Sequence, residues 1–233
     1  KKNRNYISPS FNTISGSGPN SAIPHYRANN KTNRKIKTKD IYLCDSGGQY
    51  HYGTTDVTRT ICFCKQPLRI KNIFTKVLKG HIAVAIYRLK KNTTGKRLDI
   101  VARSALKKSG LDYAHGTGHG VGYFLNVHEG PQAISKFNNI QLKEGMILSN
   151  EPGYYESNKF GIRIENLVFI KKYNSKLKFQ NLTLAPIEKD LVNFELLNKR
   201  EKKYLSEYSK KIYFILNPYL NKYEKNWLKS SIY

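Results

Sequence analysis

Apolar residues recur at helical spacing in two segments of the first half of the chain. Between residues 70 and 89 they are largely three or four positions apart, which predicts an amphipathic helix. A polar loop over residues 90–96 separates this helix from a shorter amphipathic stretch, residues 98–106, which we expect Gly110 to close as a C-cap. A third helical pattern covers residues 204–216 and stops before Pro218.

Shorter apolar runs between turn residues predict strands. Residues 41–44 and 58–63 form one pair of β-type runs, and residues 141–148 and 161–170 form a second pair around the Pro152-Gly153 break. The first 39 residues are rich in Gly, Pro, Ser and Asn, which predicts loop and short strand. Strands interleaved with helices indicate the α+β class.

Composition limits what the chain can be. Of the 233 residues, 39% are hydrophobic, enough for a packed core, which excludes disorder throughout. The apolar runs are too short to cross a bilayer and we find no leader, so no membrane association is expected. Three cysteines without zinc spacing favour a reducing compartment, and we expect the cytoplasm. The formal charge of +25 at first points to nucleic acid or another anion.

The placement of the few acidic residues changes this picture. Four of the 16 acids, Asp45, Asp56, Glu151 and Glu165, lie in apolar or Gly-rich stretches, as does His119. Burying an ionised carboxylate is costly unless a cation compensates it, so four inward carboxylates indicate bound metal. Four carboxylates and one imidazole suit two divalent ions. We expect Mn(II), with Zn, Co or Fe as alternatives, because carboxylates are hard ligands and no thiolate selects zinc.

Each of these residues also has an ordinary structural explanation. Asp45, beside Ser-Gly-Gly, would in isolation be interpreted as a turn residue. His115 and His119 could be a structural pair, and His128, before Glu-Gly-Pro, could be a turn histidine. The Lys- and Tyr-rich C-terminus is typical of a solvated helix face, so nucleic acid is not expected as a partner. Only the set taken together favours a metal site.

Five ordered motifs carry a resemblance to a known family. They resemble the pita-bread metallopeptidases, and most closely the cytosolic type of Xaa-Pro aminopeptidase, over about residues 6–230. The motifs are Asp45-Ser-Gly, Thr-Thr-Asp56-Val-Thr-Arg-Thr, His115-Gly-Thr-Gly-His119-Gly-Val-Gly, Asn150-Glu151-Pro-Gly and Gly-Ile-Arg163-Ile-Glu165-Asn.

The resemblance implies a pita-bread fold, with mixed or antiparallel sheets flanked by helices. It implies a catalytic domain over residues 1–190, with the N-terminal part of the core missing, and a C-terminal helical extension over residues 191–233 packed on it. The implied substrates are peptides with proline in second position. The implied assembly is a homodimer.

Metal-site roles follow from the same resemblance. It implies that Asp56 and Glu165 bridge two ions, that Asp45 holds one of them, and that His119 and Glu151 hold the other. A hydroxide bridging the ions would attack the carbonyl before the proline nitrogen, and Glu151 would shuttle the proton to that nitrogen.

Further residues are implied to serve catalysis or to bind substrate. His115 and His128 match family histidines that steady the oxyanion and transfer protons. His25 matches a histidine of the substrate-side pocket, so His25, His115, His128 and Arg163 are the predicted substrate-binding residues. Arg163 also resembles an arginine that pairs with a metal carboxylate, on the same strand face as Glu165.

Two other functions stay open at this stage. Some pita-bread proteins are metal-free modules that bind peptide, histone or RNA, and the charge of +25 makes this alternative worth keeping, although such relatives usually lose ligands. Methionine aminopeptidases share the five ligands, but the motif after His119 and residues 15–26 favour the proline-specific branch. Residues 61–64, Ile-Cys-Phe-Cys, depart from the family, which often carries His or Gly nearby.

Overall fold

The strands form several small antiparallel sheets instead of one large sheet. The computed structural model describes residues 4–233. One three-stranded sheet has the order β2-β3-β6, and a second has the order β13-β12-β9. The strands of these two sheets are β2 (Ile14–Ser17), β3 (Tyr42–Ser46), β6 (Val57–Ile61), β9 (Ile147–Asn150), β12 (Asn166–Tyr173) and β13 (Lys176–Asn181).

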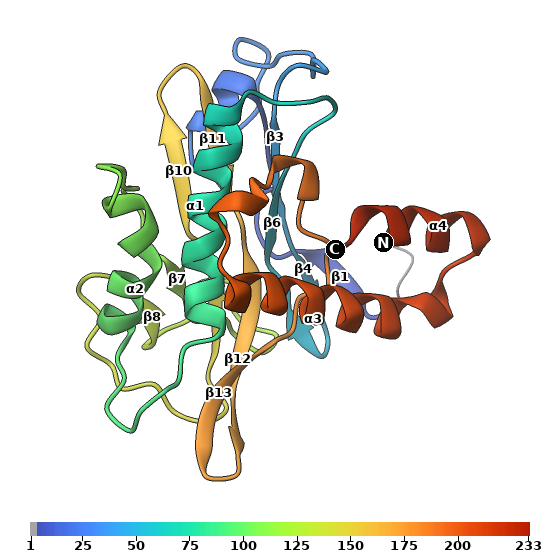
Figure 1. The fold of residues 1–233 in the computed structure, drawn as a ribbon. Helices are drawn as coiled ribbons and strands as arrows, with labels where there is room; N and C mark the ends of the chain where they lie inside the picture. The colour runs from blue at the N-terminus through green and yellow to red at the C-terminus, as the bar shows by residue number, and fades with distance from the viewer. Residues whose placement is uncertain (1–3) are drawn as a thin grey trace.

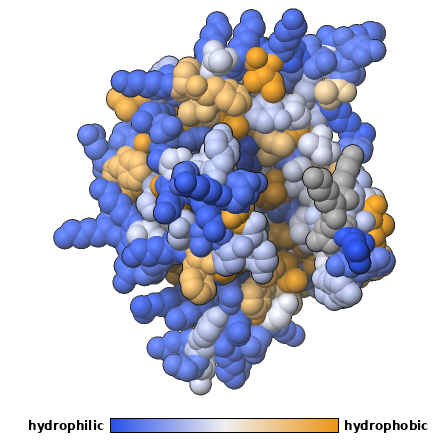
Figure 2. Space-filling view, turned by 90° about the vertical axis from the view of Figure 1, so that its right-hand side faces the viewer, coloured by the Kyte–Doolittle hydropathy of each residue, from blue (hydrophilic) through white to orange (hydrophobic). Residues whose placement is uncertain are grey.

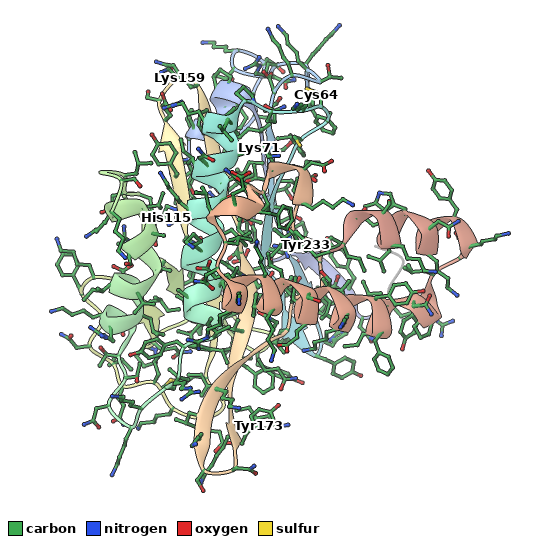
Figure 3. The ribbon with its side chains drawn as sticks, viewed as in Figure 1. Cys64, Lys71, His115, Lys159, Tyr173 and Tyr233 are labelled. Carbon is green, nitrogen blue, oxygen red and sulfur yellow. The ribbon has the colours of Figure 1, made fainter. Side chains whose placement is uncertain are left out.

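Smaller sheets complete the β structure. The third three-stranded sheet has the order β1-β4-β5, and β7 pairs with β8 and β10 with β11. The hairpins β10–β11 and β12–β13 project at opposite ends of the molecule, where Figure 3 labels Lys159 and Tyr173 (Figures 1 and 3). These strands are β1 (Tyr6–Pro9), β4 (Gly48–Tyr50), β5 (Gly53–Thr54), β7 (Gly118–His119), β8 (Ala133–Ile134), β10 (Gly153–Glu156) and β11 (Phe160–Arg163).

The first predicted strand pair is confirmed, whereas the second is wrong in detail. Residues 41–44 and 58–63 correspond to the antiparallel neighbours β3 and β6. In the second pair, β9 begins only at Ile147, and residues 161–170 form two strands, β11 and β12. The chain leaves the β10–β11 hairpin at Ile164 and Glu165 and then pairs with β9. Both strands are buried, so apolar residues recur throughout residues 161–170, and this pattern conceals the break.

Helix α1 (Leu68–Ala85) is shorter than predicted. Its expected end at residue 89 is wrong, because Leu89 leaves the helix and forms a β-bridge with Leu177 of β13. Helix α2 (Gly95–Lys107) begins three residues earlier than predicted and ends at Lys107, and Gly110 closes it as expected. Gly110 has φ +69°, its N–H donates to Lys107 O, and Leu111 N–H donates to Leu106 O, which is the Schellman arrangement.

The third predicted helix is confirmed and is followed by a fourth. Helix α3 (Lys199–Leu216) begins five residues earlier than the apolar pattern indicates, because Asn198 and Glu201 form a capping box there. Helix α4 (Lys222–Ser231) is capped in the same way by Asn221 and Glu224. The 3₁₀ turns are η1 (Gly18–Ala22), η2 (Lys189–Leu191), η3 (Phe194–Leu196) and η4 (Asn217–Tyr219).

The C-terminal helices share the main hydrophobic core with α1. Phe74 and Ile82 of α1 pack in one cluster with Leu205 and Ile212 of α3 and with Leu228 of α4, all at most 1% exposed. Figure 1 shows α1 in front of the strands, α2 beside it, and α3 beginning near the lower end of α1 and running away from it towards α4. A second cluster joins α2 to β9 and β12. The α+β class is therefore confirmed.

The surface is strongly hydrophilic. On the face shown in Figure 2, hydrophilic side chains project all round the rim and hydrophobic residues gather in separate patches. Within residues 4–233, no helix combines the length and apolar character that a membrane crossing requires. Both Cys62 and Cys64 lie beyond the end of β6, where Cys62 is half-buried against the main core and Cys64 is exposed.

Candidate metal centre

The predicted site residues come together around one cavity of about 560 Å³. They reach it from separate parts of the chain, and the loop between α2 and β7 contributes His115, which Figure 3 labels beside α1. The predicted residues that line it are His25, Asp45, Asp56, His115, His119, His128, Glu151, Arg163 and Glu165.

A compact group of three ligating side chains lies at the centre. Each of Asp56, His119 and Glu165 offers one ligand atom, and these atoms all lie within 4.8 Å of one another. His119 Nε2 is 3.4 Å from Asp56 Oδ2 and 3.3 Å from Glu151 Oε1, which brings a further carboxylate to the group. Oxygen donors with one imidazole nitrogen are a donor set that divalent ions accept.

The register of β3 and β6 brings the carboxylates of Asp45 and Asp56 close together. Asp45 of β3 stands opposite Thr58 of β6, and Asp56 precedes Thr58 by two residues. Thr58 Oγ donates to Glu165 Oε2 at 2.8 Å, and Glu165 N–H donates to Thr58 O at 3.1 Å. Glu165 itself lies in the break between β11 and β12, and Asp45 reaches the same region through Arg163.

Few positive charges or hydrogen-bond donors compensate the burial of Asp45, Asp56 and Glu165. Burial, reinforced by the negative charge of Asp45, raises the pKa of Asp56 to about 9. Burial also raises the pKa of Asp45, and burial together with the Asp56 charge raises the pKa of Glu165 well above its ordinary value. Asp45 Oδ1 and Glu165 Oε1 are buried and have no hydrogen-bond partner among the described residues. Unpartnered buried carboxylate oxygens fit cation ligands.

One guanidinium lies among these acids. Arg163 Nη2 donates to Asp45 Oδ2 at 2.7 Å, and its Nε donates to Thr58 Oγ at 3.0 Å. Its Nη1 donates to the Tyr155 hydroxyl at 2.6 Å. Arg163 and Glu165 both contact Thr58, so the two side chains lie on the same side of their segment. A single positive charge leaves most of the negative charge of the cluster uncompensated.

Glu151 differs from the other acids. Ser149 Oγ donates to Glu151 Oε1 at 3.0 Å and accepts from His119 N–H at 2.9 Å. Although burial acts to raise the pKa of Glu151, the charges of His119, His115 and Arg163 outweigh it and hold that pKa below its ordinary value. Glu151 is therefore the acid in the cluster best suited to stay ionised and accept a proton.

The three outer histidines have different surroundings. His115 Nδ1 lies 2.6 Å from Gly116 O and its Nε2 lies 2.9 Å from the Tyr155 hydroxyl, so both ring nitrogens already have protein partners. Burial lowers the pKa of His115. The exposed His128 ring packs edge-on against His119 with centroids 4.2 Å apart, and burial and the His119 charge lower its pKa. His25 is exposed on the cavity wall.

Three residues of the site were not predicted from the sequence. Thr58 and Ser149 each stand two positions from a ligand, Asp56 and Glu151, so strand alternation could have placed them on the ligand face. Tyr155 bonds both Arg163 and His115, but it comes from the β10–β11 hairpin and no local motif marks it. Its position depends entirely on tertiary structure.

Comparison with protein families gives two matches that together cover almost the whole chain. Residues 1–172 match metallopeptidase family M24, and residues 175–232 match the C-terminal region of peptidase M24. A probable Xaa-Pro aminopeptidase P from Laccaria bicolor is 50% identical over 222 residues, which is 91% of this chain and 35% of that protein.

Solved structures show the same fold. An X-prolyl aminopeptidase from Caenorhabditis elegans, described as a cytosolic enzyme with a di-nuclear active site, superposes with a TM-score of 0.92 at 40% identity and covers 99% of this chain. A prolidase from Pyrococcus furiosus superposes with a TM-score of 0.69 at 34% identity over 77% of this chain. The chain spans 39% of the first structure and 50% of the second. The predicted pita-bread fold is therefore confirmed.

Proposed function

The chain belongs to metallopeptidase family M24, and from this premise we propose that it carries the catalytic centre of an Xaa-Pro aminopeptidase. The proposed reaction removes the N-terminal residue of a peptide whose second residue is proline. The observation that carries the proposal is the convergence of Asp45, Asp56, His119, Glu151 and Glu165 on one cavity. The residues 1–190 would form the catalytic domain and residues 191–233 the extension packed on it.

The donor set fits two divalent ions, and manganese is our first choice. Asp56, His119 and Glu165, which form the central group, would hold these ions together with Asp45 and Glu151 of the same cavity. When bound, two such ions supply Lewis acidity that activates water and polarises the scissile carbonyl.

The surrounding side chains then have distinct tasks. Glu151, ionised and held by Ser149, is the proposed base that takes up a proton and returns it to the leaving proline nitrogen. His128 and His25, both exposed on the cavity wall, are proposed to contact the substrate. His115 would act together with Tyr155, because its ring nitrogens are already bonded.

Arg163 is proposed to orient Asp45. Its guanidinium bonds Asp45 at 2.7 Å and cannot be exchanged for a lysine ammonium without losing the simultaneous bonds to Thr58 and Tyr155. Outer groups of this kind set the direction in which a carboxylate presents its free oxygen. Asp45 Oδ1 is that free oxygen here.

Location and assembly are proposed with the function. The three cysteines are free, and the Caenorhabditis elegans neighbour is described as cytosolic, so we propose the cytosol for this protein. We also propose a homodimer. Light scattering of the purified chain, which gives its molar mass directly, tests the assembly.

Hydrolysis by the purified chain tests the function. With Mn(II) added, we expect cleavage of Arg-Pro-Pro and much less of Met-Ala-Ser. Asp56→Asn should lose activity and metal, whereas Glu207→Gln, an exposed change on α3, should lose neither. Two bound ions with preferred Met-Ala-Ser cleavage would favour a methionine aminopeptidase. An intact chain that binds no metal would favour the peptide, histone or RNA binding module.

A further inference from the structure

Arg59 lies next to the proposed metal centre, but its side chain is on the opposite face of β6 from the carboxylates. It lies on β6 between Thr58 and Thr60, and successive strand residues point to opposite faces. Thr58 and Thr60 face Arg163 and Glu165, so the side chain of Arg59 points to the other side, towards the C-terminal part of the chain.

Every N–H group of the Arg59 guanidinium has an acceptor. A guanidinium carries five N–H donors in a planar fork, and six acceptor atoms surround this one at 2.6 to 3.2 Å. Within residues 4–233 no carboxylate pairs with it. The acceptors are the main-chain oxygens of Thr58, Glu165, Ala185 and Pro186, the Asn166 Oδ1 and the Tyr208 hydroxyl.

The shortest of these bonds goes to a proposed metal ligand. Arg59 Nη1 donates to Glu165 O at 2.6 Å. Glu165 lies in the break between β11 and β12, so it belongs to neither strand. Thr58 holds its N–H and one carboxylate oxygen, and Arg59 holds its carbonyl. The peptide unit that carries this ligand is therefore fixed on both sides by residues of β6.

The other end of the guanidinium is held by the C-terminal region. Arg59 Nη2 donates to Ala185 O at 2.8 Å and to the Tyr208 hydroxyl at 3.2 Å. Tyr208, on α3 and only 4% exposed, also accepts from Asn166 Nδ2 and lies 2.9 Å from Ala185 O. In Figure 1, α3 runs in front of β6 and β12, and the bonds of the Tyr208 hydroxyl to Arg59 of β6 and Asn166 of β12 show that these elements lie close together.

We propose that Arg59 is a positioning residue that fixes the ligand Glu165 through its main-chain carbonyl, and that Tyr208 of α3 holds Arg59 in that position. The helix α3 is then part of the support of the metal centre. This inference rests on the proposed function only in taking Glu165 as a metal ligand.

Substitutions of two neighbouring tyrosines, Tyr204 and Tyr208, distinguish an effect on the position of Arg59 from a general loss of stability. Tyr204 stacks on Tyr208 with ring centroids 6.0 Å apart, but its hydroxyl accepts from Asn181 Nδ2 at 2.9 Å and not from Arg59. Tyr208→Phe and Tyr204→Phe each remove one hydroxyl from the same helix face. Only the first removes a bond to the guanidinium.

Titration calorimetry with MnCl₂ on the metal-free full chain tests the proposal. Arg59→Lys should weaken metal binding about 10- to 100-fold, as changes around metal ligands do, because an ammonium cannot reach Glu165 and Ala185 together. Tyr208→Phe should weaken it several-fold, and Tyr204→Phe should leave it unchanged. The unfolding temperature of each metal-free variant is measured in parallel.

The outcomes discriminate between the two proposals. Unchanged metal affinity in both Arg59→Lys and Tyr208→Phe, or equal losses in Tyr208→Phe and Tyr204→Phe, would overturn the role of Arg59. If Arg59→Lys does not fold, the tyrosine pair decides alone. A folded wild-type chain that binds no manganese would overturn the proposed function as well, and the wild-type titration therefore distinguishes that failure from this one.

Discussion

The acidic cluster should make the metal-free protein less stable as pH rises. Asp56 has its pKa raised from 3.8 to about 9 by burial and by the charge of Asp45. A group whose pKa is higher in the folded than in the unfolded state favours folding below its unfolded pKa, and this advantage is lost as pH rises through the folded pKa. The free energy of unfolding should therefore fall between pH 4 and pH 9.

The size of this effect follows from the shift. One pKa unit corresponds to about 1.4 kcal/mol, so Asp56 alone accounts for at most roughly 4 kcal/mol between pH 4 and pH 7. Asp56→Asn replaces the carboxylate by a neutral group of nearly the same shape. We expect this variant to be more stable than the wild type at pH 8 without metal, and to have a shallower dependence on pH.

Urea unfolding of the chain in EDTA, from pH 5 to pH 9, measures both effects. Added Mn(II) should reverse the order, because binding to the folded state stabilises the wild type while the variant has lost a ligand. Glu207→Gln, on the exposed surface of α3, serves as the control and should follow the wild type at every pH. Equal slopes for wild type and Asp56→Asn would refute the reasoning, as would a wild-type stability that does not change with pH.

Three further changes test the rest of the structure. Ile212 of α3 is fully buried in the core between α3 and α1, so Ile212→Ala should lower the free energy of unfolding in urea by about 2–5 kcal/mol. As a control, Ile100→Ala, at a residue that is 54% exposed, should lower it by less than about 1 kcal/mol. Tyr155→Phe removes the hydroxyl bonded to Arg163 and should reduce kcat/KM about tenfold with metal content unchanged, and loss of metal would contradict this. Asn198→Ala should cost about 1 kcal/mol in thermal unfolding because the capping box of α3 is lost, and an unchanged Tm would show that the cap contributes nothing.

Local patterns were enough to predict much of the fold and most of the site. Helical spacing located α1, α2 and α3, and Gly110 ends α2 by the Schellman arrangement that a glycine at this position favours. The end of α1 was predicted too late, because Leu89 is apolar for a different reason, its bridge to Leu177. Periodicity shows that a residue is buried but not which neighbour buries it.

Sequence by itself was enough to predict the side chains that the fold gathers around one cavity. Acids are scarce in a chain of charge +25, so an aspartate or glutamate in an apolar stretch stands out, and the five motifs that resemble the metallopeptidases mark the predicted ligands in order. Residue type and local spacing are properties of the chain that do not depend on its path in space. Prediction of these five side chains as metal ligands therefore required no coordinates.

Only the tertiary structure decided which residues hold those side chains in place and how their charges shift one another's pKa values. Arg59 and Tyr208 lie 149 residues apart, and Tyr155 and His115 lie 40 apart, so no local pattern relates them. The raised pKa of Asp56 likewise requires burial and the approach of Asp45. Coulombic interaction and desolvation depend on distance in space, and only the folded chain fixes those distances.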